Sequence, residues 1–186
     1  MKRAILTSIA ASIIILVMAG CAAKCRPPEW FTGEAPDDPN YIFSRTTASS
    51  KDLQLALSKA KEEARVDIAR QVQVKVEALT KRFLEETGSG EDAEVLTFFQ
   101  DVSKSVVSEV LTGCSVLRQD FCKDGMIYKA YIMMAMPTGS IYESYYNKLK
   151  AEERMYTRFR ATQAFKELEE EVKKYEQFKK EQGLLR

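Results

Sequence analysis

Residues 52–86 carry one uninterrupted stripe of apolar side chains at helical spacing, and any fold of this chain has to cover that stripe. Apolar positions three and four residues apart lie on one face of an α-helix, so the pattern predicts a single long amphipathic helix. Ser49 offers an N-terminal cap, with Asp52 three residues on, and Gly88 begins the glycine-rich segment that ends the helix. The stripe consists of Leu53, Leu57, Ala60, Ala64, Ile68, Val72, Val76, Leu79 and Phe83.

The segments on either side of this helix predict a small antiparallel sheet. Residues 40–47 are rich in β-favouring types that alternate between two faces, which indicates a strand. Residues 115–122 and 126–136 predict two more strands, joined by a turn whose Asp124-Gly125 pair favours a hairpin. Because both faces of the last strand are apolar, we expect it in the middle of the sheet.

A second, shorter helix is predicted over residues 91–111. Its stripe consists of Val95, Phe98 or Phe99, Val102, Val106 and Val110. The element order is then strand, long helix, second helix and hairpin, which indicates an α+β fold with a small antiparallel sheet packed on the long helix.

Residues 140–182 predict a third, heavily charged helix at the C-terminus. Its apolar residues form two seams at coiled-coil spacing that are out of phase, with the slip near Ala161. We expect self-association through these seams; a single solvated helix lying on the domain is the alternative. The first seam contains Tyr142, Tyr145, Leu149, Tyr156 and Phe159, and the second contains Phe165, Leu168, Val172 and Tyr175.

The composition excludes several classes of function. The 186 residues have a formal net charge of +1, which argues against a nucleic-acid binder that depends on a basic surface. The chain contains no histidine, which removes Ser-His and Cys-His nucleophiles, imidazole metal ligands and the most frequent general base near neutral pH.

The N-terminal residues have the layout of a secretory leader. Lys2 and Arg3 are followed by residues 4–23, which carry no charge. A basic start, an apolar middle and small residues before a cleavage site are typical of a signal peptide. Met18-Ala19-Gly20-Cys21 resembles the lipobox of bacterial lipoproteins, in which the cysteine becomes the first mature residue and carries the lipid. An uncleaved anchor is the alternative, because about 20 apolar residues can just cross a bilayer.

The leader predicts where the rest of the chain resides. The basic end stays in the cytoplasm, so everything after Cys21 is expected outside the inner membrane, held by acyl chains. Ala22 is not the aspartate that, by resemblance to enterobacterial lipoproteins, signals inner-membrane retention, and this favours the outer membrane, on its periplasmic or surface face. The predicted division is a signal peptide (1–20), the lipidated cysteine and a tether (21–40), an α+β domain (41–137) and a charged C-terminal helix (138–186).

The tether contains two large aromatic rings, Trp30 and Phe31, among prolines that prevent a continuous helix. Aromatic rings dominate core burial. We therefore expect this pair to pin the start of the domain to its core, rather than to form a recognition motif.

Several of these features together resemble one known family. They are Cys21, the Pro28-Glu29-Trp30-Phe31 entry, Tyr41-Ile42-Phe43-Ser44, residues 60–69 (AKEEARVDIA), Gly125 and Tyr128. Over residues 28–137 the chain resembles the LPP-twenty lipoprotein family, which includes flagellar outer-membrane lipoproteins of the FlgP type. The resemblance implies a curved antiparallel sheet that cradles a helix, on a lipid-anchored outer-membrane protein without known chemistry. It also implies that the protein can assemble into rings around a flagellar motor.

Three cysteines remain once Cys21 is assigned to the lipid, an odd number for an oxidising compartment. In one straight strand Cys114 and Cys122 would lie ~26 Å apart, far beyond the ~7 Å Cα limit for a disulfide. They can pair only if residues 115–121 form a loop or a bent strand; alternatively one of them pairs with Cys25 and leaves a spare thiol. The spacing of Cys114 and Cys122 also differs from that of a zinc knuckle.

Adjacent carboxylates occur at Glu62-Glu63, Glu85-Glu86 and residues 169–171, each beside basic residues on a predicted helix. This pattern is typical of solvated helix faces rather than of carboxylates across a cleft. We therefore predict a non-enzymatic protein with no catalytic, cofactor or metal site. It is expected to act through its position on the membrane and through association with itself or another envelope protein, and not with nucleic acid. The alternative is a periplasmic binding module that regulates a cell-wall enzyme.

Overall fold

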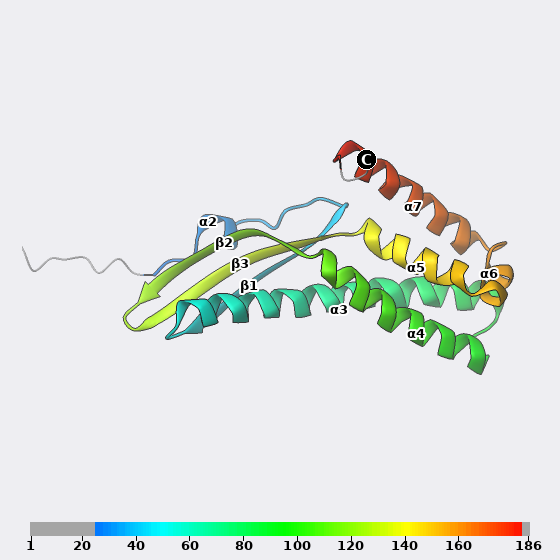
Figure 1. The fold of residues 1–186 in the computed structure, drawn as a ribbon, viewed down its shortest axis with the longest axis horizontal. Helices are drawn as coiled ribbons and strands as arrows, with labels where there is room; N and C mark the ends of the chain where they lie inside the picture. Colours follow the sequence, from blue (N-terminus) through cyan, green and yellow to red (C-terminus); the bar gives the residue numbers. More distant parts are fainter. Residues whose placement is uncertain (1–24, 184–186) are drawn as a thin grey trace, which may run out of the picture.

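The computed structural model describes residues 25–183 as an elongated molecule, with a sheet towards one end and a group of helices at the other (Figure 1). The predicted signal peptide and Cys21 lie outside the described residues. The α+β class predicted from the sequence is confirmed.

Strands β1 (Tyr41–Ser50), β2 (Ser115–Asp124) and β3 (Ile127–Pro137) form one antiparallel sheet in the order β1-β3-β2. The central position predicted for the last strand is therefore confirmed. Its residues from Ala130 to Met136 are all buried, because both faces of β3 are covered. Side chains alternate between the faces of a strand, so Ile132 and Met134 point to opposite sides from Tyr131 and Met133.

Helix α3 (Leu53–Thr87) crosses one face of the sheet and covers β1 and β3 (Figure 1). The predicted stripe faces the core, with Leu53 and Leu79 only partly buried at its margin. Asp52, rather than Ser49, caps the helix: its carboxylate accepts from the backbone N–H of Leu55 at 2.7 Å. The cap lies later than predicted because β1 continues through Ser50.

Helix α4 (Ala93–Val110) packs beside α3 and leads into a short 3-10 turn, η1 (Leu111–Gly113). Its buried face is the predicted one, and Phe99 rather than Phe98 belongs to it. Between the two helices, Gly88 adopts a left-handed conformation with φ of 63°, which lets the chain reverse after α3.

The C-terminal part is helical as predicted, but it is divided into α5 (Gly139–Ala151), α6 (Glu153–Phe159) and α7 (Gln163–Glu181). The chain is extended at Glu152 and again at Thr162, whose hydroxyl caps α7 by accepting from the N–H of Phe165 at 3.2 Å. The continuous helix over residues 140–182 is therefore wrong. The slip near Ala161 marks the point where α7 folds back along α5.

This fold-back buries both predicted seams within the same chain. Tyr145 and Phe159 from the first seam and Phe165 and Leu168 from the second are all at most 2% exposed. The rings of Tyr146 and Phe165 lie 5.5 Å apart between α5 and α7. Most of the seam residues therefore pack within the chain, while Tyr142, Tyr156 and Tyr175 stay partly exposed; self-association remains a prediction.

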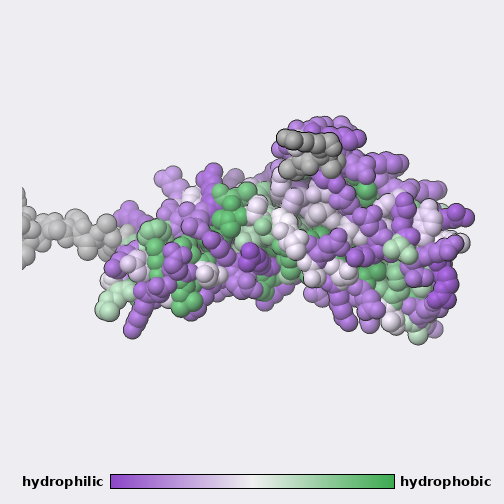
Figure 2. Space-filling view, in the orientation of Figure 1, coloured by the Kyte–Doolittle hydropathy of each residue, from purple (hydrophilic) through white to green (hydrophobic). Residues whose placement is uncertain are grey.

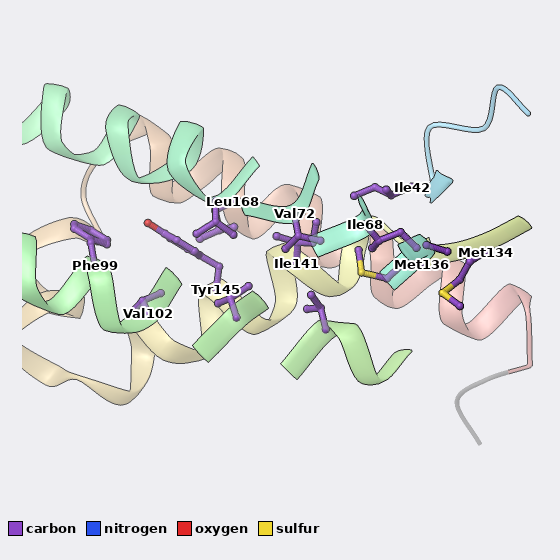
Figure 3. Packing of buried hydrophobic residues seen from close by; sticks show 14 of the residues in the cluster. Ile42, Ile68, Val72, Phe99, Val102, Met134, Met136, Ile141, Tyr145 and Leu168 are labelled. Carbon is purple, nitrogen blue, oxygen red and sulfur yellow. The ribbon is translucent and has the colours of Figure 1, made fainter. Parts of the chain in front are cut away.

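One apolar core runs from the sheet into the C-terminal helices (Figure 3). At the helical end, the Phe83 ring lies 6.1 Å from Phe99, 6.0 Å from Tyr145 and 5.5 Å from Phe159, which joins four helices. Burial raises the pKa of Tyr145, whose hydroxyl bonds Thr80 at 2.9 Å. The predicted boundary at residues 137/138 therefore does not separate two cores.

Candidate functional site

Cys25 and Cys122 form a disulfide that fastens the N-terminal end of the described chain to β2. Their Cα atoms lie 5.3 Å apart, although they are separated by 97 positions in the sequence. A Cys114–Cys122 bond is therefore wrong, because residues from Ser115 onward form the extended strand that keeps these two cysteines apart. The alternative, in which one of the pair bonds Cys25, is confirmed.

Cys114 keeps a free thiol within residues 25–183. Its side chain is partly buried against the core, and burial raises the pKa of the thiol. A raised pKa makes the reactive thiolate scarcer, which is the opposite of what a nucleophilic cysteine requires.

The segment after Cys25 lies on the face of the sheet opposite α3 (Figure 1). It includes the short helix α2 (Glu29–Thr32). The Phe31 ring packs edge-on against Tyr131 of the central strand, with ring centroids 5.0 Å apart. Phe31 thus pins this segment to the sheet, but on the face away from the main core, and neither ring of the pair belongs to that core as predicted.

Arg45 of β1 also holds this segment against the sheet through hydrogen bonds. Its Nη1 atom donates to the carbonyl oxygens of Trp30 at 3.2 Å, Phe31 at 3.1 Å and Gly33 at 2.8 Å. These carbonyls close the short α2 turn, so the guanidinium serves as its C-terminal cap. With the disulfide, this holds residues 25–33 of the predicted tether against the sheet.

Three of the adjacent carboxylates make contacts that serve the fold, and two of the runs also line open surface pockets, Glu62 and Glu63 in one and Glu170 and Glu171 in the other. Glu86 accepts from the N–H of Ala164 at 3.0 Å, at the start of α7. Glu169 accepts from the Tyr146 hydroxyl at 3.0 Å, and Glu62 pairs with Arg65 at 3.8 Å within α3. These are capping, hydrogen-bonding and surface ion-pair contacts within the fold.

An open groove of about 410 Å3 lies between α3 and α4. Leu84, Leu96 and Phe99 form its apolar wall, and Lys81 and Lys104 stand among its polar residues. The hydroxyl of Thr80, which also lines the groove, bonds the hydroxyl of the buried Tyr145 at 2.9 Å.

Two kinds of feature are missing from residues 25–183. No group of three or more His, Cys, Asp or Glu side chains is placed to hold a metal ion. No helix in this range combines the length and the apolar character needed to cross a membrane.

Comparison of the whole chain with family models, with curated proteins and with solved structures finds no match. The LPP-twenty resemblance therefore stays a prediction from the sequence. The Cys25–Cys122 disulfide, beside the β2–β3 hairpin, is the feature of the structure that bears most directly on function.

Proposed function

We propose that this protein is an outer-membrane lipoprotein, anchored through acyl chains on Cys21, with a structural or assembly role and no catalytic activity. The observation that carries the proposal is the Cys25–Cys122 disulfide. Structural disulfides form and persist in oxidising compartments, so this bond supports the export that the N-terminal leader predicts.

The position of the disulfide supports lipid anchoring in particular. Only three residues separate Cys21 from Cys25, where the fixed part of the chain begins. A lipid on Cys21 would therefore hold the folded domain close to the bilayer. Anchoring confines the protein to two dimensions, which raises the effective concentration for weak contacts between envelope proteins.

Strand β2 supports an assembly role, because it forms an edge of the sheet and nearly all of its residues are exposed. Unpaired backbone groups at an edge can accept a strand from another chain. A bulge between Val116 and Arg118 interrupts this edge, which leaves the stretch from Arg118 to Asp124 as its regular part. The same edge would serve the alternative, a periplasmic module that binds a cell-wall enzyme.

Replacement of Cys21 by serine tests the anchor. In a host that processes lipoproteins, Cys21→Ser should move the protein out of the membrane fraction, because no thiol remains to carry the acyl chains. Cys114→Ser is the matched control and should stay with the membranes. Unchanged membrane fractionation of Cys21→Ser would contradict the proposal.

The role after anchoring is tested by capture of the lipidated protein from cross-linked cells. Enrichment of the same chain or of motor components supports assembly, and enrichment of cell-wall synthases supports the alternative.

A further inference from the structure

We propose that the turn end of the β2–β3 hairpin is a second membrane contact, which inserts apolar side chains into the bilayer surface beside the acyl anchor. The inference rests on the proposed lipid at Cys21. We define the hairpin end as Phe121, Met126 and Ile127, together with Leu55 in the first turn of α3.

The hairpin end gathers exposed apolar side chains where a water-soluble turn would be polar. Met126 is 75% exposed and Phe121 is 48% exposed. Leu55 joins them because Ser50 pairs with Tyr128 and α3 starts just after that pair. Half of the eight large apolar side chains that are exposed within residues 25–183 lie here, and Figure 2 shows apolar surface among charged groups at this end. Exposed apolar clusters mark contact surfaces.

The short link between Cys21 and Cys25 indicates that this apolar surface contacts a membrane. Four peptide units join Cys21 to Cys25 and can span at most about 14 Å. Cys25 is bonded to Cys122, which lies two residues before the end of β2, about 7 Å from the turn. The bilayer that receives the lipid is therefore within reach of the hairpin end.

The opposite end of the molecule is not held near the lipid. Helix α3 has 35 residues and starts beside the hairpin, so its far end lies about 52 Å away. While Cys25 stays bonded to Cys122, the tether of four peptide units keeps the hairpin end close to the bilayer surface, whatever the tilt of the rest of the molecule. The hairpin end is therefore the exposed apolar surface that the anchor presents to the lipid.

The charges near the hairpin end nearly cancel, which points to apolar insertion rather than attraction to anionic lipid. Lys51, Lys123 and Lys129 stand against Asp52, Asp120 and Asp124, and Arg26 beside Cys25 adds a single positive charge. Two of the lysines also lie over tyrosine rings, Lys123 at 5.0 Å from Tyr128 and Lys129 at 5.7 Å from Tyr131. Contact with a zwitterionic phosphatidylcholine surface should therefore suffice, and salt should not weaken it.

Tryptophan quenching in vesicles tests the contact. The lipidated full-length protein, with Trp30→Phe to remove the native indole, receives one new indole through Met126→Trp. The matched control is Val74→Trp, at a position that is 66% exposed in the middle of α3. Both proteins are reconstituted into phosphatidylcholine vesicles whose acyl chains carry bromine, and vesicle flotation is measured in parallel.

We expect Met126→Trp to lose emission and shift to the blue in brominated vesicles, with no change for Val74→Trp. Flotation without quenching at position 126, or equal quenching at both positions, would overturn the hairpin contact and leave the lipid anchor standing. If the protein purified from a host that processes lipoproteins fails to float with the vesicles, both the lipid anchor and the hairpin contact are overturned. Adding Cys25→Ser and Cys122→Ser should reduce the quenching at position 126, because the tether then lengthens; undiminished quenching would show that the disulfide does not set the orientation.

Discussion

Loss of the Cys25–Cys122 disulfide should destabilise the protein substantially, because the bond closes a loop of 97 positions. In the chain-entropy model, a loop of this length restricts the unfolded chain by about 4.7 kcal/mol at 25 °C. That figure lies near the top of the range of about 2–5 kcal/mol that removal of a native disulfide from a small secreted domain costs. Local detachment of the N-terminal segment would lower it, but the contacts of Phe31 with Tyr131 and of Arg45 with three carbonyls oppose detachment.

The assay is urea unfolding of Cys25→Ser/Cys122→Ser against the parent, both followed by far-ultraviolet circular dichroism. Cys114→Ser is the control, because the free thiol closes no loop. Non-reducing tryptic mapping of the parent should show the peptide of residues 119–123 joined to the peptide that begins at Cys25. A stability loss below about 0.5 kcal/mol, the size of an ordinary surface substitution, would refute the reasoning. So would a map in which the Cys114 peptide carries the bond.

Three other perturbations test the packing of the helical end. The hydrogen bond from Arg158 and that from the N–H of Val95 hold the pKa of Asp92 below its usual 3.8, so its carboxylate adds stability above about pH 4 that is lost as pH falls through the lowered value. The stability gap between the parent and Asp92→Asn, measured by denaturation at several pH values, should therefore close in acid; a gap independent of pH would contradict this. Gly139→Ala places a Cβ on the ring and Cβ of Tyr175, so urea unfolding should show a loss of about 1–3 kcal/mol, and an unchanged midpoint would contradict the close α5–α7 contact. A stop after Pro137 removes part of the shared core, so dichroism should report an unfolded chain; a cooperative, native-like transition would contradict a single core.

The long helix and the hairpin could be predicted because their patterns are local. The apolar stripe from Leu53 to Phe83 repeats at helical spacing along nearly all of α3. This local pattern alone is enough to favour a helix over a strand, without knowledge of the tertiary contacts. The two apolar faces of β3 likewise identify a central strand whatever covers it.

The division of the C-terminal segment could not be read in full from local preference. Residues 140–182 contain no glycine or proline, so helix propensity alone favours continuity. The breaks at Glu152 and Thr162 occur because folding back buries Leu149 and Leu168 in one core. The signals that were present are the phase slip near Ala161 and the capping residue that follows it.

The pairing of Cys25 with Cys122 likewise could not be predicted from local sequence alone. Strand spacing argued against a bond between Cys114 and Cys122, but the choice of Cys25 as the partner depends on how residues 25–33 lie across the sheet. Arg45 on β1 belongs to no motif, and its bonds to the carbonyls of residues 30–33 depend on where that segment lies on the sheet. Disulfide connectivity of this kind is decided by tertiary structure.

Mass spectrometry of the mature N-terminus, from protein purified out of the membrane fraction, tests lipid anchoring most directly. Cleavage after Lys24 should release a peptide that begins at Cys21 and carries the added mass of acyl chains, while Cys25 stays bonded to Cys122. A mature chain that begins elsewhere, or an N-terminal Cys21 without acyl groups, would contradict the lipid anchor and the membrane orientation inferred from it.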